Sequence, residues 1–80
     1  MPRYFFDIRT ASGALAPDRE GIVLADLDAV AREIVLTAEG LNEDARRGGY
    51  DYAGCYFEIR VDDGSKIFTA PVSANSAPKA

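Results

Sequence analysis

Few side chains in this sequence of 80 residues are suited to chemistry. The chain has one cysteine, Cys55, and no histidine. A thiol becomes a nucleophile when a base or a positive charge beside it favours the thiolate. Histidine is the commonest general base near neutral pH and a frequent metal ligand. The composition therefore predicts a protein that is not an enzyme, in which Cys55 is a small buried hydrophobic residue.

Two short acidic stretches are the remaining candidates for metal binding, and neither has a suitable pattern. Asp62-Asp63 stands before Gly64, and aspartate is a common residue of turns. The stretch Asp18-Arg19-Glu20 lacks the ligand spacing of a calcium-binding loop. The glycine pair Gly48-Gly49 belongs to no phosphate-binding motif. We therefore expect no metal and no cofactor.

The charge balance argues against nucleic acid as a partner. Nine basic residues stand against thirteen acidic ones, which gives a net charge of −4. Proteins that bind DNA or RNA need clustered positive charge to neutralise phosphates, and here Arg46-Arg47 is the only adjacent basic pair. No apolar run approaches the ~20 residues of a membrane span, and the N-terminus lacks the pattern of a signal peptide. A single cysteine fits a reducing compartment, so we expect a cytoplasmic protein.

Residues 27–46 form the clearest predicted element, an amphipathic helix. Apolar residues recur along it at spacings of three and four, as in a helix that packs one face on a core. Asp26 is placed to cap the N-terminus. Gly48-Gly49 is placed to end the helix, since glycine readily takes the left-handed conformation there. The predicted apolar stripe consists of Leu27, Val30, Ala31, Ile34, Ala38, Leu41 and Ala45.

The N-terminal part is predicted to supply two strands. Residues 3–9 alternate between two sets of side chains and are rich in aromatic residues, which is typical of a strand. After a turn at Ser12-Gly13, a short second strand is expected at residues 21–24. Residues 14–16 are the alternative for the same pairing.

Residues 55–61 and 66–72 are predicted to form a hairpin. A two-residue turn at Asp63-Gly64 suits the type that needs positive φ at both positions. The expected pairs are Cys55 with Val72, Tyr56 with Pro71, Phe57 with Ala70, Glu58 with Thr69, Ile59 with Phe68 and Arg60 with Ile67. Pro71 lacks an N–H, so its strand belongs at an edge of the sheet.

Together these elements predict an α+β fold in one domain, residues 1–73, followed by a flexible tail at residues 74–80. If the first two strands form a hairpin and the third strand lies beside the first, the antiparallel sheet has the order 2-1-3-4. The helix then covers one face, and the fold is a two-layer sandwich. The predicted core consists of Tyr4, Phe6, Ile8, Phe57, Ile59, Val61 and Phe68 against the helix stripe.

The open face of the predicted sheet mixes aromatic and charged side chains. Phe5 lies there among charges, with Tyr56 and Ile67 on neighbouring strands. Such a face either stabilises itself through cross-strand pairs or serves self-association or ligand binding, because apolar groups rimmed by charge mark interfaces. The predicted interaction face comprises Arg3, Phe5, Asp7, Arg9, Tyr56, Glu58, Arg60 and Ile67. On the helix, Leu36 lies opposite the apolar stripe and is either a lone exposed leucine or a second contact point.

Several short motifs resemble one protein family over nearly the whole chain. They are the opening M-P-R-Y-F-F-D, the stretch P-D-x-E-G at residues 17–21, the helix entry L-x-D-L-x-A at residues 24–29, and the closing F-E-I-x-V-x-D-G with a following P-V. The chain thus resembles a family of short bacterial proteins, common in alphaproteobacteria, known as domain of unknown function 6894. Members often have histidine after the F-F pair, where this chain has Asp7. The resemblance implies a fold but no activity.

Two functions remain in view. The first is a non-enzymatic interaction module that forms a homodimer through the open sheet face or an edge strand, as small domains often do. The second is an antitoxin-like regulator that neutralises a protein partner. The layout is similar to the partial double-stranded-RNA-binding fold of HicB-type antitoxins, in which a P-D-x-x-G stretch precedes a helix, and an acidic chain suits a basic partner.

Overall fold

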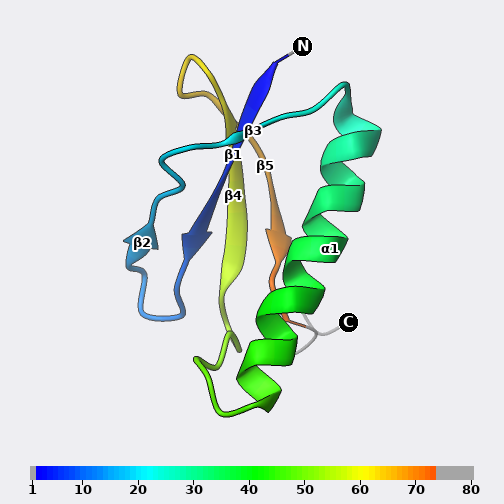
Figure 1. Ribbon diagram of the computed structural model, residues 1–80. Helices are drawn as coiled ribbons and strands as arrows, with labels where there is room; N and C mark the ends of the chain where they lie inside the picture. Colours follow the sequence, from blue (N-terminus) through cyan, green and yellow to red (C-terminus); the bar gives the residue numbers. More distant parts are fainter. Residues whose placement is uncertain (1, 74–80) are drawn as a thin grey trace, which may run out of the picture.

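A single helix packs on one face of an antiparallel sheet in the computed structural model, which describes residues 2–73 (Figure 1). This confirms the predicted two-layer α+β fold. The predicted tail, residues 74–80, lies outside the described residues. In chain order the elements are β1 (Arg3–Arg9), β2 (Leu15–Ala16), β3 (Ile22–Val23), α1 (Leu27–Arg46), β4 (Tyr56–Val61) and β5 (Lys66–Pro71).

The order of the sheet is β2-β1-β4-β5, and β3 also pairs with β1. Both alternatives for the second strand therefore form, and they share one side of β1. Ile8 pairs with Ala16, and Tyr4 pairs with Ile22. Between these pairs, the five residues 17–21 stand opposite only three residues of β1, so this edge is one strand interrupted by a bulge.

The hairpin turn between β4 and β5 is longer than predicted. The two-residue turn at Asp63-Gly64 is wrong, because among the described residues only glycines have positive φ. The loop contains three residues, 62–64. It is closed by a hydrogen bond from the Gly64 N–H to the Val61 carbonyl at 2.8 Å, with Gly64 at φ +89°. This is the other common hairpin connection, a turn followed by a glycine bulge.

A second irregularity returns the hairpin to the predicted register. Arg60 pairs with Lys66 instead of Ile67, so Ile67 is an extra residue in β5. The longer turn shifts the pairing by one residue and this bulge shifts it back. The pairs beyond it are therefore as predicted, from Ile59 with Phe68 to Tyr56 with Pro71.

Helix α1 has the predicted bounds and caps. The Asp26 side chain accepts a hydrogen bond from the Ala29 N–H at 2.9 Å. At the other end, Gly48 has φ +92°, and the Gly49 N–H donates to the Asp44 carbonyl at 2.9 Å. These bonds satisfy backbone groups that the ends of a helix otherwise leave free.

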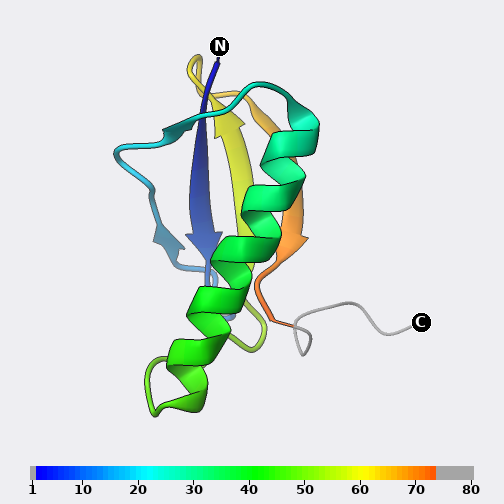
Figure 2. The same ribbon diagram turned by 45° about the vertical axis from the view of Figure 1, so that its right-hand side comes forward.

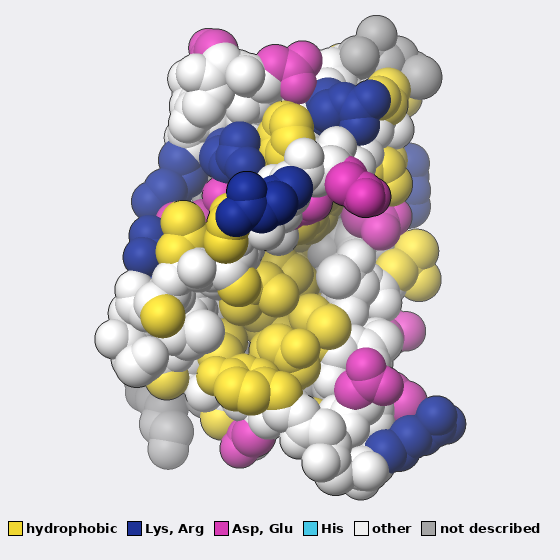
Figure 3. Space-filling view, turned by 60° about the vertical axis from the view of Figure 1, so that its left-hand side comes forward, with side chains coloured by type: hydrophobic (Ala, Val, Ile, Leu, Met, Phe, Trp, Pro, Cys, Tyr) yellow, Lys and Arg dark blue, Asp and Glu magenta, His cyan; other side chains and the backbone are white. Residues whose placement is uncertain are grey.

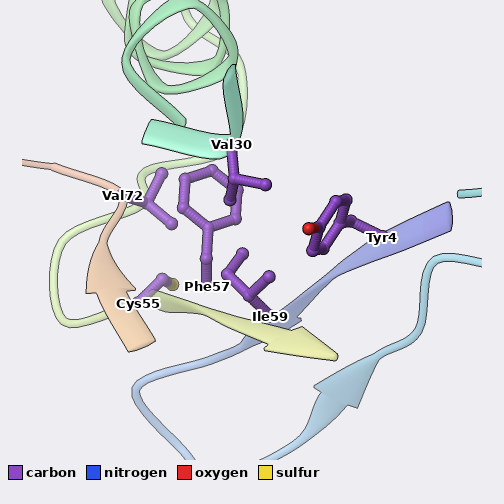
Figure 4. Packing of buried hydrophobic residues seen from close by; sticks show 6 residues of the cluster. All are labelled: Tyr4, Val30, Cys55, Phe57, Ile59 and Val72. Carbon is purple, nitrogen blue, oxygen red and sulfur yellow. The ribbon is translucent and has the colours of Figure 1, made fainter. Parts of the chain in front are cut away.

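The core lies between α1 and the middle of the sheet (Figure 4). Val30 points from α1 toward Phe57 of β4, and the rings of Phe57 and Phe6 meet edge to face with centroids 6.2 Å apart. The fully or nearly fully buried hydrophobic residues are Tyr4, Val30, Cys55, Phe57, Ile59 and Val72. The other predicted core residues of the sheet, Phe6, Ile8, Val61 and Phe68, pack against this cluster and are half-buried.

Most of the predicted stripe of α1 faces the sheet, since Val30 belongs to the buried core and Ile34, Ala38 and Leu41 pack against it. Leu27 and Ala31, which were expected in the core stripe, are exposed. Asn42 lies on the same flank of α1 and donates to the Val72 carbonyl just beyond β5, at 2.7 Å. Leu27 and Ala31 are in the first two turns of α1, so the exposure is confined to the N-terminal end of the stripe.

On the β1 side the core is less well covered. Phe57 and Ile59 of β4 are fully buried, whereas Phe6 and Ile8 of β1 are only half-buried. Figure 3, seen from the β2 side, shows hydrophobic side chains gathered in a hollow in the middle of this face. One helix is about 10 Å wide, and a sheet of four strands is about twice as wide. A single helix therefore covers only part of the sheet face. Figure 2 shows how α1 crosses the sheet at an angle.

Candidate interaction surface

The predicted interaction face lies on the side of the sheet that α1 does not cover. Register pairs Phe5 with Arg60, Asp7 with Glu58, and Arg9 with Tyr56. Alternation along the strands therefore places the predicted residues of β1 and β4 on this face. Arg60 shares the face with Lys66 and Ile67, since the bulge sets two residues opposite one. The structure thus brings together Arg3, Phe5, Asp7, Arg9, Tyr56, Glu58, Arg60 and Ile67.

Two buried carboxylates occupy the centre of this face. Asp7 and Glu58 are directly opposite each other and are only 4% and 7% exposed. Like charges in this position destabilise a sheet, but each has a diagonal partner. Arg60 Nε lies 2.7 Å from Asp7 Oδ2, and Arg9 Nε lies 3.0 Å from Glu58 Oε2. Lys66 Nζ is 3.3 Å from the other oxygen of Glu58, so the charges at the centre are paired.

Hydrogen bonding sets the protonation states of Glu58 and Arg9. The hydrogen bond from Arg9 lowers the pKa of Glu58 below its ordinary value, and the bond from Lys66 lowers it further. The same bond to Glu58 raises the pKa of Arg9. Both partners are therefore held in their charged forms, which suits an ion pair and not an acid–base catalyst.

The same arginines fasten the connection of residues 10–24 to the sheet. Each guanidinium on this face donates to a backbone carbonyl of that connection. The bonds run from Arg3 Nη1 to Glu20 O at 2.8 Å, from Arg9 Nη1 to Gly13 O at 2.9 Å, and from Arg60 Nη2 to Asp18 O at 3.0 Å. Much of the β1 half of the predicted face therefore binds the chain's own connection.

Asp18 holds the bulge in place, a role that was not predicted from the sequence. Its Oδ2 accepts from the Phe6 N–H at 3.1 Å, and its Oδ1 accepts from the N–H groups of Glu20 and Gly21. The Asp18 side chain thus replaces the strand backbone that is missing between β2 and β3. Its own N–H donates to Asp7 Oδ1 at 2.8 Å. The available signal was the stretch Pro17–Gly21, since aspartate commonly bonds backbone N–H groups just after it.

The pKa of Asp18 reflects these bonds. Burial by itself would raise the pKa of this carboxyl group. The backbone hydrogen bonds from Gly21, Phe6 and Glu20, together with the charge of Arg60, outweigh burial and lower the pKa below its ordinary value. Asp18 is therefore held as a carboxylate.

Phe5 is explained by two neighbours. Its ring centroid lies 4.4 Å from the Arg60 guanidinium carbon, which is a cation–π contact. The ring also lies close to Gly21, where a Cβ atom would come within 2.8 Å of Phe5 Cε2. Phe5 is half-buried in this arrangement. It stabilises the connection and contributes little free apolar surface.

Accessible apolar side chains of this face lie on both sides of the sheet. Leu15 and Val23 pair with Arg9 and Arg3 on the β2–β3 edge and are 44% and 41% exposed. On the β4–β5 half, the exposed large hydrophobic residues are Tyr56 and Ile67.

Tyr56 is 38% exposed and Ile67 is 39% exposed. Tyr56 pairs with exposed Pro71 at one end of this half, and Ile67 lies at the other end. The pair of Glu58 and Thr69 lies between them. We call Tyr56, Ile67, Thr69 and Pro71 the β4–β5 surface. Leu36, the second predicted contact, is 63% exposed on the opposite layer.

Cys55 and the acidic side chains were the other candidates for chemistry in the sequence. Cys55 is fully buried in the core, as predicted. Within residues 2–73, no three side chains of the metal-binding types are gathered in a group that could hold an ion. Over the same residues, no helix combines the length and hydrophobicity needed to cross a membrane.

Comparison with known proteins identifies the family. The family described as "Domain of unknown function (DUF6894)" matches residues 3–73. No curated protein and no solved structure matches the chain. The family match extends from the first residue of β1 to just beyond β5. The chain therefore belongs to the family of the domain of unknown function DUF6894.

Proposed function

We propose that this protein is a small, non-enzymatic interaction module that forms homodimers through the β4–β5 surface. The observation that carries this proposal is the exposure of Tyr56 and Ile67 on the side of the sheet opposite α1. Tyrosine and isoleucine supply the apolar contact that the centre of an interface needs. The free, buried thiol of Cys55 is compatible with a cytoplasmic location.

The ion pairs beside this surface favour association. Desolvating an unpaired charge at an interface is strongly unfavourable. Here Glu58 already bonds Arg9 and Lys66, and Asp7 already bonds Arg60. In residues 2–73, no buried side-chain nitrogen or oxygen lacks a hydrogen-bond partner. A second copy can therefore cover the surface without leaving a carboxylate unpaired.

The free edges of the sheet are less suitable than the face. The Val72 N–H donates to the Cys55 carbonyl, so alternation directs the nitrogen of Pro71 away from β4. Pro71 thus removes a donor from the outer edge of β5, and the bulge at Ile67 interrupts that edge at its other end. The opposite edge consists of two-residue strands separated by the bulge at 17–21. Both edges have features that prevent further strand pairing.

A lysine at either apolar end of the surface tests this proposal. We expect Tyr56→Lys and Ile67→Lys to raise the dissociation constant of the dimer by roughly tenfold or more, because each buries a charge in the interface. Light scattering over a hundredfold range of concentration measures the molar mass of each variant. Circular dichroism checks that each variant is folded.

Val35→Lys is the matched control for this experiment. Val35 is 56% exposed, but it lies on α1, on the other side of the molecule from the β4–β5 surface. The same change there is expected to leave the dimer intact. A wild type that stays monomeric, or a dimer that Tyr56→Lys and Ile67→Lys do not weaken, contradicts the proposal.

The acidic surface of α1 supports a second candidate, an antitoxin-like regulator of a basic protein. The helix carries five acidic and two basic residues. Such a surface attracts a positively charged partner and speeds its association. This candidate requires that a small basic protein encoded beside this gene binds the chain at a fixed ratio and loses its toxicity on binding. A gene without such a neighbour argues against it.

A further inference from the structure

The β4–β5 surface is too small to hold a stable dimer by itself. A large side chain has about 200 Å² of surface, and Tyr56 and Ile67 are only 38% and 39% exposed. Together with Thr69 and Pro71 they offer roughly 300 Å², whereas a stable interface covers about 800 Å² of each partner. A dimer that forms there must therefore extend over more of the open sheet face.

The β2–β3 edge offers further apolar side chains on the same face. Leu15 and Val23 are both exposed there. Leu15 pairs with Arg9, and Arg9 pairs on its other side with Tyr56. Tyr56 in turn pairs with Pro71. These four residues form one row across the sheet, and the row has an apolar side chain at each edge.

The two halves of the open face differ in height. The backbone of the bulge at residues 17–21 rises above the sheet, because side chains of the open face bond it from below. Asp7 Oδ1 accepts from the Asp18 N–H at 2.8 Å, and Arg60 Nη2 donates to the Asp18 carbonyl at 3.0 Å. Within residues 2–73, no backbone is held in this way above the β4–β5 surface. We call the half with the bulge the raised half and the other half the low half.

Height and charge determine how two such faces fit together. The two-fold axis of a face-to-face dimer lies between the sheets, either along the strands or across them. An axis along the strands exchanges the two edges, so the raised half of each copy lies on the low half of the other. An axis across the strands, through the centre of the face, sets raised half on raised half and Arg9 on Arg3 of the second copy. The axis along the strands is therefore favoured.

We propose that the dimer has its two-fold axis along the strands and that Leu15 of each copy packs on Tyr56 and Pro71 of the other. Both contacts then form at once, as a two-fold interface requires. This inference rests on the proposed function, because it names the second half of the same interface. The β2–β3 edge thus binds a second copy of this chain.

The charges of the open face are compatible with this arrangement. β1 of each copy lies over β4 of the other, so Arg9 faces the ring of Tyr56, which favours a cation–π contact. Asp7 faces Glu58, but each copy already pairs these two carboxylates with three cations. Helix α1, with five acidic and two basic residues, lies on the outer layer of each copy. The two acidic helices are then separated by both sheets, which exceeds the screening length of about 10 Å.

A lysine in place of Leu15 tests the contact, and Ala16 provides the matched control. Ala16 is adjacent and also exposed, but it pairs with Ile8 and therefore lies on the helix side of the sheet. We expect Leu15→Lys to raise the dissociation constant of the dimer by roughly tenfold or more, because it buries a charge in the interface. Ala16→Lys should leave the dissociation constant unchanged. Light scattering measures association, and circular dichroism checks that both variants are folded.

Chemical crosslinking tests the direction of the axis. In Leu15→Cys/Pro71→Cys, a short bismaleimide should join two copies into a covalent dimer that persists on a denaturing gel. Neither single variant should crosslink, because the same residue of the two copies lies at opposite edges, about 14 Å apart along the sheet. The wild type gives the background, since its Cys55 is fully buried. An axis across the strands would instead crosslink Leu15→Cys/Val23→Cys.

The outcomes separate this inference from the proposed function. A covalent dimer of Leu15→Cys/Pro71→Cys, together with weaker association of Leu15→Lys, supports the arrangement. An unchanged dissociation constant for Leu15→Lys, or no more covalent dimer from the double variant than from the single ones, overturns it. Crosslinking of Leu15→Cys/Val23→Cys overturns it as well. If Tyr56→Lys still weakens the dimer in these cases, the proposed function stands, whereas a wild type that is monomeric at every concentration overturns both.

Discussion

Replacing Gly21 with alanine is expected to destabilise the fold by about 3 kcal/mol. Gly21 has φ +68°, a conformation in which a Cβ atom is strained. The same Cβ atom would come within 2.8 Å of the Tyr4 carbonyl oxygen and within 2.9 Å of Arg3 Cγ. The backbone carbonyl cannot move without disturbing β1. Urea unfolding followed by circular dichroism measures the loss.

Gly13→Ala is the matched control for this change. Gly13 also has positive φ, +91°, but a Cβ atom there would meet nothing within 4 Å. Its substitution should cost only the conformational strain, about 1 kcal/mol. The difference between the two variants isolates the contact of the connection with β1. Equal losses for both variants would show that this contact contributes nothing.

Removing the Asp18 carboxylate is expected to have the second largest effect. In Asp18→Ala, the N–H groups of Phe6, Glu20 and Gly21 lose their acceptor. The bonds to Phe6 and Gly21 are partly buried, so water replaces them incompletely, and the loss should be about 2 kcal/mol. Asp18→Asn keeps one acceptor oxygen and should recover part of the loss. Urea unfolding at pH 7 compares the three proteins.

Acid should weaken the protein through the same carboxylate. Folding lowers the pKa of Asp18 and of Glu58 below their ordinary values of 3.8 and 4.5. The stability that the carboxylates contribute is therefore complete above about pH 5 and is lost as the pH falls from these values through the lower pKa values of the folded state. Between pH 5 and pH 3, Asp18→Asn should lose less free energy of unfolding than the wild type. Parallel curves for the two proteins would contradict the role given to Asp18.

The sequence predicts α1 and the β4–β5 hairpin well because their signals are local. Asp26, the apolar spacing and Gly48 lie within or beside the helix that they define. The exposure of Leu27 and Ala31 could not be predicted in this way. Both have the right spacing for the core, but whether the first turns of α1 lie over the sheet depends on how the helix crosses it. The length of the 62–64 turn was predicted wrongly, because Asp62 and Asp63 suit either kind of loop.

The interaction face was predicted as a set of neighbours, but not with the contacts that those neighbours make. Alternation along β1 and β4 placed Phe5, Asp7, Glu58 and Arg60 together on the open face. The connection that three arginines bind is distant in the sequence, so no periodic pattern indicates it. The exposure of Phe5 was consequently overestimated, and Tyr56 and Ile67 are the better probes of association.

The pairing of β1 with β4 also has a consequence for how the chain folds during synthesis. Residues paired between these central strands are 47 to 57 positions apart, whereas those paired between β4 and β5 are 6 to 15 positions apart. Long-range pairing requires closure of a large loop and slows folding. β1 is synthesised before β4 and cannot pair with it until residue 61 has left the ribosome. The pairing of β1 with β4 is therefore among the last contacts to form during synthesis. Until then, Tyr4 and Phe6 of β1 lack the core residues of β4 that they pack against.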